Sequence, residues 1–328
     1  MMMPILIALA AGCASALMFA SIISGALVSL LLFYLAPLPL LVAALGWGTT
    51  GAVVGGLVAG ISLGALFGIP YFITFAVTVV LPACLLGHVA LLARQLPAPA
   101  ASGNDSAPQP TTVTEWYPVG RLVAWIAGFA ALTTMAALFT LGTDAATITS
   151  ALRGGLQRML GARDATDAAD IADIAKLAGA MAVVAPAAAA IVATMMLTLN
   201  LFLAAKIARI SGRLHRPWPD LKATELPPMT LAVLSAAIAL CFLDGLPAMF
   251  GQTSTAALTI AYALAGFAAL HTLTLPIRHR TFVLSSTYAL VMVFGWPVLA
   301  MVALGIADAV LGLRHRNVLR PPPPPSPV

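Results

Sequence analysis

The first 93 residues contain no Asp, Glu, Lys or Arg, and this feature limits the fold more than any other. A membrane-spanning helix needs about 20 consecutive apolar residues, so this stretch is long enough for about four spans. A soluble domain has about 25% charged residues. The whole chain has only 8%, with a mean hydropathy of +1.01. The sequence therefore predicts a protein that is solvated mainly by lipid.

Further charge-free runs follow Arg94, at residues 122–143, 177–205, 226–243, 245–277 and 281–307. Inside lipid, backbone groups must be hydrogen-bonded within their own segment, which favours helices. The runs lack the alternating pattern of a β-barrel strand. We therefore expect an all-α, polytopic transmembrane helix bundle with about eight full spans plus a C-terminal helical hairpin. The expected helices are 4–22, 26–46, 49–68, 71–93, 120–142, 179–208, 229–247, 253–275, 282–294 and 297–313, with kinks at Pro37, Pro39 and Pro186.

The distribution of Lys and Arg predicts the orientation. The loops 94–121, 206–225 and 276–281 and the tail after residue 313 hold twelve cations, namely Arg94, Arg121, Lys206, Arg209, Arg213, Arg216, Lys222, Arg278, Arg280, Arg314, Arg316 and Arg320. The opposite side holds four, namely Arg153, Arg158, Arg163 and Lys176. Because cytoplasmic loops are enriched in Lys and Arg, the first side is predicted to be cytoplasmic, together with both termini. Placement at span ends also explains the basic residues better than nucleic-acid binding does.

The last apolar run lies between two basic clusters, Arg278 with Arg280 and Arg314 with Arg316. If both clusters are cytoplasmic, residues 282–313 must enter the membrane and return. Gly and Pro break helices, so Phe294-Gly295-Trp296-Pro297 is the expected bend. The alternative is one long tilted helix that violates the charge rule.

Composition divides the chain into four regions. Residues 1–93 form a four-helix membrane region, and residues 94–118, which are rich in Pro, Ala, Ser and Thr, are expected to be a disordered cytoplasmic linker. Residues 119–313 form a second membrane region. The tail 314–328 is basic and rich in Pro.

The second region includes an extracytoplasmic segment, residues 143–178, that has an amphipathic pattern. Apolar side chains recur at helical spacing at Ile148, Leu152, Leu156, Met159 and Leu160, which favours a helix lying on the membrane surface. Acidic residues follow at steps of three, at Asp164, Asp167, Asp170 and Asp173. They form either a face that attracts cations or the water-facing side of a helix whose apolar side is Ile171, Ile174 and Leu177.

Small residues form stripes on two of the expected helices. Gly56, Gly60, Gly64 and Gly68 recur every four residues, directly after Gly51 and Gly55. On the first helix, Ala8, Gly12, Ala16 and Ala20 form one stripe, and Ala10 and Ala14 lie on another. Small residues let helix backbones approach closely. The stripes therefore serve packing within the protein or docking of a partner helix.

Four polar side chains lie inside expected spans, where polar groups are costly and often functional. They are His88, Asn200, His271 and Asp308. Asp308 can reach Arg314 or Arg316 and form an ion pair, Asn200 can bridge helices, and both histidines are close to span ends. Their spacing forms no proton relay or metal cluster.

The chain carries no recognisable catalytic or redox motif. Cys13, Cys84 and Cys241 lie apart in apolar runs, which is typical of buried cysteines. The motifs HExxH and GxSxG and the P-loop are absent. We therefore predict no catalytic residue, no metal and no cofactor.

Several short stretches resemble the YybS-like family of predicted bacterial membrane proteins of unknown function. They are FYLAPLP at 33–39, EWYP at 115–118, GTD at 142–144, GFAALH at 266–271, and GIAD at 305–308 followed by RHR at 314–316. More distantly, the first four helices resemble the substrate-binding S components of energy-coupling-factor vitamin transporters. That resemblance implies a bacterial cytoplasmic membrane, a vitamin-like solute, and Ala10 and Ala14 as the docking positions for energy-coupling subunits.

These observations leave three hypotheses. The chain is a transport component that binds a small neutral solute, because buried charge is sparse. Alternatively, it is a non-transporting scaffold or assembly factor of the cell envelope. An intramembrane enzyme acting through His88 or His271 is the third.

Overall fold

The computed structural model describes residues 2–97, 112–161 and 167–314, and this part of the chain is mainly helical. It divides into two compact units. The first unit comprises Met1–Leu122 and Met196–Trp218, and the second comprises Val123–Met195 and Pro219–Val328. The division predicted from composition did not place residues 196–218 in the first unit.

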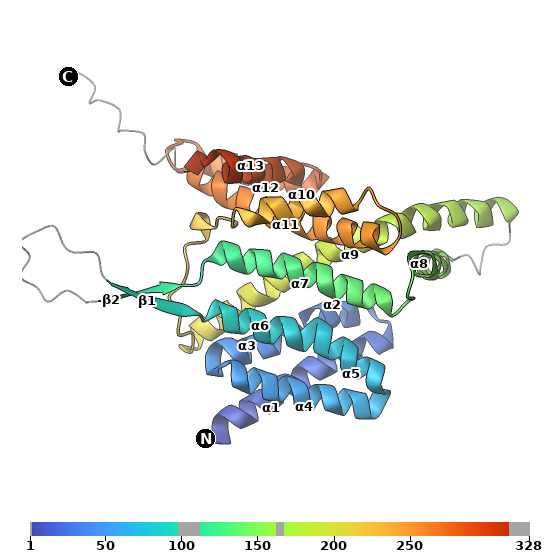
Figure 1. Ribbon diagram of the computed structural model, residues 1–328, viewed down its shortest axis with the longest axis horizontal. Helices are drawn as coiled ribbons and strands as arrows, with labels where there is room; N and C mark the ends of the chain where they lie inside the picture. Colours follow the sequence, from blue (N-terminus) through green and yellow to red (C-terminus); the bar gives the residue numbers. More distant parts are fainter. Residues whose placement is uncertain (1, 98–111, 162–166, 315–328) are drawn as a thin grey trace, which may run out of the picture. The chain divides into compact units, whose positions relative to one another are not determined.

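The first unit is built mainly from the charge-free N-terminal region (Figure 1). Its elements are α1 (Met2–Ala20), a 3-10 turn η1 (Ser21–Ser24), α2 (Leu27–Leu35), α3 (Pro37–Trp47), α4 (Thr49–Phe67), α5 (Ile69–Phe75), a π-helical turn η2 (Ala76–Val80) and α6 (Leu81–Ala90). The end of the long helix α9 (Ala168–Ile210) also belongs to it. Pro37 lacks the N–H that would continue α2, so the helix breaks at Ala36, where the sequence predicts a kink.

Helices α1 and α4 of the first unit cross so closely that their backbones are in contact. A methyl group on Gly12 would overlap the carbonyl of Gly55, and one on Gly55 would overlap the carbonyl of Ala8. Since lipid provides no hydrophobic drive between helices, such close packing is a main source of their association.

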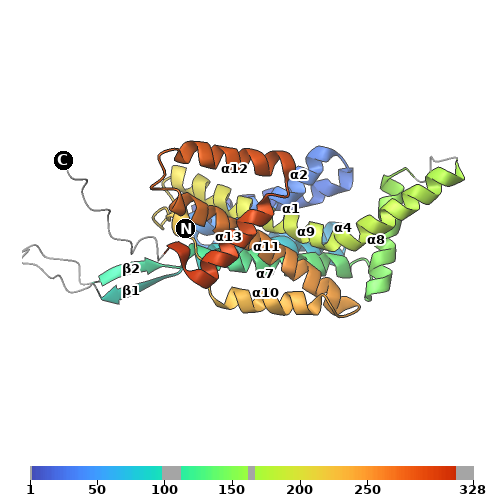
Figure 2. The same cartoon turned by 90° about the horizontal axis from the view of Figure 1, so that it is seen from above.

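A two-stranded antiparallel ribbon, β1 (Ala93–Pro97) with β2 (Thr112–Trp116), extends beyond the helices of this unit (Figures 1 and 2). Arg94 lies opposite Glu115 and forms an exposed ion pair with it, and Gln95 lies opposite Thr114 and exchanges side-chain hydrogen bonds with it. The expectation of a disordered linker is therefore wrong at both of its ends. The intervening residues 98–111 lie outside the described part of the chain.

The second unit holds the remaining helices. They are most of α7 (Val119–Phe139), α8 (Ala145–Met159), the first part of α9, a 3-10 turn η3 (Leu221–Ala223), α10 (Met229–Leu240), α11 (Leu246–Leu273), α12 (Arg280–Phe294) and α13 (Val298–Leu311).

The C-terminal hairpin predicted from charge is present. The chain turns at Gly295, whose φ of +70° suits glycine, and Pro297 precedes α13 (Figure 2). α13 packs on α11 through Gly266 and Gly305, and Arg314 beyond its end shares the Lys222 carbonyl with Thr272 at the end of α11. α12 therefore runs one way and α13 returns, so Arg278 and Arg280 lie at the same end of this unit as Arg314.

Seven helical segments in the described residues are long and apolar enough to cross a membrane. They are Ile5–Ser24, Val28–Trp47, Thr49–Phe67, Ile69–Ala90, Val119–Phe139, Ala169–Ile210 and Leu246–Leu273. These segments make the chain a multi-pass membrane protein. The expected span 229–247 falls short, because α10 ends at Leu240 and the chain turns at Gly245, with a φ of +75°.

The amphipathic segment 143–178, which was expected to be extracytoplasmic, differs from expectation in where it ends. α8 forms as the apolar spacing predicts, and Ile148 is fully buried with Met135, Leu138 and Met249. The acidic residues that follow do not form a helix of their own. α9 is one helix of 43 residues that continues through Pro186, and its first turns carry Asp170 and Asp173. Asp167, Asp170 and Asp173 are exposed, whereas Asp164 lies outside the described residues.

Candidate functional site

The glycine stripe of α4 is used for packing within the first unit. A methyl group on Gly56 would lie 2.6 Å from the Val80 side chain, and one on Gly64 would lie 2.9 Å from Phe72. Gly60 also faces Phe72, and Gly68 takes a φ of +96° at the turn into α5. Gly56, Gly60 and Gly64 therefore face neighbouring parts of the same chain, whereas Gly68 is exposed and serves the turn.

The two stripes of α1 have different surroundings. Ala8 and Gly12 face α4, as described above. Ala10 is exposed and Ala14 is half-buried on α1. Of the two stripes, the one containing Ala10 is therefore the more accessible to a neighbouring molecule in the membrane.

Asn200 lies deepest among the polar residues predicted to be functional. Its side chain is fully buried on α9, and its amide nitrogen donates to the carbonyl of Tyr34 over 2.8 Å. Tyr34 directly precedes the break between α2 and α3. The predicted bridge between helices is thus confirmed.

Only the amide nitrogen of the Asn200 side chain takes part in that bridge. The Oδ1 atom of Asn200 is buried and has no hydrogen-bond partner in the described residues. A buried polar atom without a partner costs about 1–3 kcal/mol. Such an atom is a ready acceptor for a donor on a bound molecule.

The residue whose carbonyl binds Asn200, Tyr34, belongs to an aromatic cluster that draws on three elements of the first unit. We define it as Phe19, Phe33, Tyr34 and Phe75. The ring of Phe19 lies 5.4 Å from that of Phe33 and 5.3 Å from that of Phe75, and the rings of Phe33 and Tyr34 are 5.7 Å apart. Phe75 directly precedes the π-helical turn η2, and such turns are frequent at functional sites.

Ser15 is a second buried polar group next to the cluster. It lies one turn before Phe19 on the same face of α1, and its hydroxyl is buried without a partner in the described residues. Ser15 was not among the residues predicted from the sequence, because a serine in an apolar helix normally bonds to its own backbone. The aromatic cluster, Asn200 and Ser15 together form the candidate site of the first unit.

Asp308 has a different environment in the second unit, where it pairs with Arg314. Arg314 Nε and Nη2 donate to Asp308 Oδ2 over 2.8 and 2.6 Å, and each side chain is only 6% exposed. The pairing expected with Arg314 is confirmed, whereas Arg316 lies outside the described residues.

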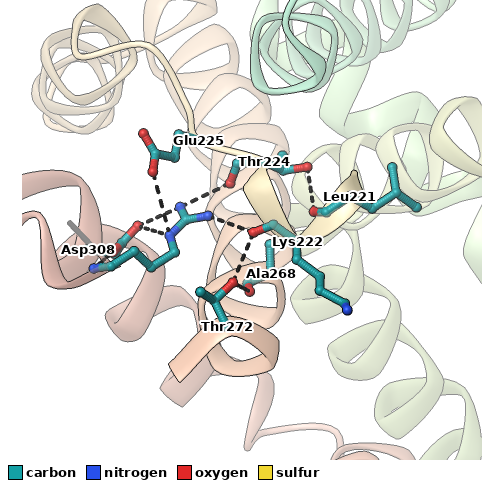
Figure 3. A network of polar contacts seen from close by, with 8 residues as sticks. Leu221, Lys222, Thr224, Glu225, Ala268, Thr272 and Asp308 are labelled. Atoms are coloured by element: carbon teal, nitrogen blue, oxygen red, sulfur yellow. Dashed lines mark hydrogen bonds and ion pairs between the residues drawn. The ribbon is translucent and has the colours of Figure 1, made fainter. Parts of the chain in front are cut away.

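The same guanidinium also fastens the chain before α10. Its Nη1 and Nη2 atoms donate to the carbonyls of Lys222 and Thr224, each over 3.0 Å, and Glu225 approaches Nε at 3.8 Å. Figure 3 shows Asp308, Thr224 and Lys222 converging around this group. Because Arg314 is held by these contacts, the arrangement is a structural clasp that ties α13 to the segment 222–225.

The two histidines are not brought together with these groups. His271 Nε2 lies 2.8 Å from the Tyr288 hydroxyl, and Tyr288 stacks on Phe267 at 5.3 Å, so His271 links α11 to α12. His88 is exposed in the last turn of α6. In the described residues, no three His, Cys, Asp or Glu side chains are placed to hold a metal ion.

Comparison with protein-family models, with curated proteins and with solved structures gave no match.

Proposed function

We propose that this membrane protein is a transport component that binds a small, neutral, ring-bearing solute at the candidate site of the first unit. The observation that carries the proposal is the buried Oδ1 atom of Asn200, which has no hydrogen-bond partner among the described residues, while the amide nitrogen of the same side chain binds the carbonyl of Tyr34 in the aromatic cluster. A donor on the solute would satisfy this atom, and aromatic rings favour offset or edge-to-face contact with another ring.

Charge supports a neutral solute. The 93 residues that supply most of this unit contain no ionised side chain to neutralise a charged ligand. Moving an unpaired ion into such surroundings is costly. A vitamin-like molecule with amide or hydroxyl donors fits these constraints better than an ion.

The proposal includes the resemblance to the YybS-like family and, through it, to S components of energy-coupling transporters. The accessible position of Ala10 and the half-buried Ala14 support docking of an energy-coupling subunit on α1. In this proposal the protein lies in a bacterial cytoplasmic membrane with both termini inside, and it carries out no catalytic step.

The test is purification of the full chain from its native membrane in a mild detergent, followed by mass spectrometry of small molecules and proteins. We expect a stoichiometric neutral solute, with energy-coupling ATPases in the same fraction. Copurifying envelope-assembly proteins without a solute would instead favour the scaffold hypothesis. The exposed apolar side chains of the amphipathic segment 143–178, such as Met159 and Ile171, would suit that role.

Two variants separate binding from folding. Asn200→Leu removes the unsatisfied atom, so we expect unchanged or higher thermal stability and at least tenfold less retained solute. Thr194→Val on the same helix is the control. Thr194 is equally buried, but its hydroxyl is satisfied by the Ala190 carbonyl at 2.7 Å. Equal solute retention in both variants would contradict the proposed site.

A further inference from the structure

The end of the first unit where α9 stops carries an excess of positive charge. The described cations of this unit are Arg94, Arg121, Lys206, Arg209, Arg213 and Arg216. Among its described residues the one acid is Glu115, and Arg94 pairs with it. Arg209, Arg213 and Arg216 therefore have no acidic partner within the described residues of the unit.

Two of these arginines lie over tryptophan rings. The guanidinium carbon of Arg209 is 4.9 Å from the centre of the Trp218 ring, and that of Arg213 is 5.7 Å from the centre of the Trp47 ring. Neither guanidinium has a hydrogen bond or ion pair with any residue that the structure describes. The rings thus restrain both groups while their N–H donors stay unused.

Arg216 is the third member of the group and is half-buried. Its Nη1 donates to the Ala90 carbonyl over 3.0 Å, but its Nε is buried without a partner in the described residues. Burial also lowers the pKa of Arg216, which marks a charge that has lost part of its hydration. An anion nearby would offset that loss.

A tight turn brings the three arginines to the end of a membrane span. α9 ends at Ile210, Gly212 takes a φ of +65°, and the N–H groups of Arg213 and Leu214 both donate to the Ala208 carbonyl. Tryptophan favours the depth of the lipid headgroups, so Trp47 and Trp218 are expected at that level.

We propose that Arg209, Arg213 and Arg216 bind the phosphate of an anionic phospholipid. Guanidinium groups match phosphate oxygens in pairs, which gives both strength and geometry. The occupant is a lipid because α9 also exposes apolar side chains in its last turns, next to Arg209, along which acyl chains can lie; they are Phe202, Ile207 and Ile210. This site is independent of the proposed solute site.

The experiment is native mass spectrometry of the full chain in detergent, titrated with phosphatidylglycerol or with phosphatidylcholine of the same acyl chains. The site variant is Arg209→Gln, Arg213→Gln and Arg216→Gln combined. The control variant, with Arg153→Gln, Arg158→Gln and Lys176→Gln, removes the same charge elsewhere. Thermal melting checks that both variants fold, and the single variant Arg213→Gln is a milder substitute because this side chain is exposed.

We expect wild type to bind at least one phosphatidylglycerol about tenfold more tightly than phosphatidylcholine, and the site variant to lose this preference while the control keeps it. Each cation near a membrane surface adds about a fivefold effect, so the loss is measurable. Replacing the three arginines by lysine should restore only part of the preference, since lysine cannot bind phosphate in pairs. Equal loss in site and control variants, or displacement of the lipid by millimolar inorganic phosphate, would overturn the proposal.

Discussion

The clasp of the second unit and the candidate site of the first unit bury polar side chains in opposite ways. In the second unit, Asp308 and Arg314 satisfy each other, and Tyr262 and Thr230 share a hydrogen bond of 2.9 Å. In the first unit, Asn200 and Ser15 each keep a buried atom without a partner among the described residues. A satisfied buried group is explained by stability, whereas an unsatisfied one costs stability and needs another reason. The difference assigns structure to the clasp and ligand binding to the first unit.

Breaking the clasp should have the largest effect on stability. Arg314→Met leaves the Asp308 carboxylate buried without its cation, which costs about 3–5 kcal/mol. We expect a loss of many degrees in the melting temperature in detergent. The double variant Asp308→Leu with Arg314→Met should recover most of it, because no charge is then left unpaired. A double variant as unstable as the single one would show that the pair itself, not the orphaned charge, stabilises the unit.

The second-largest effect on stability is expected where α11 and α13 cross at glycines in the second unit. A methyl group on Gly266 would overlap the carbonyl of Met301, so Gly266→Ala forces α11 and α13 apart at a cost of about 1–3 kcal/mol. Gly12→Ala should have a similar effect on α1 and α4 in the first unit. The matched control is Gly128→Ala on α7, where an added methyl group would have no described atom beyond its own stretch of helix within 4 Å, so alanine should be neutral or slightly stabilising. Equal melting temperatures for the Gly266 and Gly128 variants would contradict the close crossing.

A smaller effect is expected at the start of α8. Asp144 caps this helix by accepting from the Thr147 hydroxyl and backbone N–H, and these bonds, the hydroxyl first, lower the pKa of its carboxyl. A lowered pKa means that the cap contributes fully above the ordinary value and is lost as the pH falls through the lowered one. Asp144→Ala should lose helical circular dichroism at neutral pH, and the difference from wild type should shrink in acid. A difference that is constant with pH would contradict the cap.

Charge and hydropathy predicted most of the helices, because lipid forces each apolar run to satisfy its own backbone. The turn at Gly295 and the pairing of Asp308 with Arg314 also followed from sequence. The ribbon did not, since the pairing of residues 93–97 with 112–116 joins two short polar stretches whose composition is typical of a linker. The length of α10 was overestimated because hydropathy does not mark the turn at Gly245.

The candidate site was predictable only in part. Asn200 stood out as a polar residue in an apolar run, and its bridge to another helix was expected. The aromatic cluster joins Phe19, Phe33 and Phe75 from three elements, and no local pattern reports such a contact. The clasp likewise uses the carbonyls of Lys222 and Thr224, and backbone acceptors have no residue type that a sequence could reveal.

The most direct test of the contrast between the units is the solute retained by two variants purified in parallel, Asn200→Leu and the double variant Asp308→Leu with Arg314→Met. We expect that Asn200→Leu folds normally and loses the solute, while the double variant retains it at the wild-type ratio once folded. If Asn200→Leu kept the solute and the clasp variant released it, the assignment of ligand binding to the first unit would be wrong.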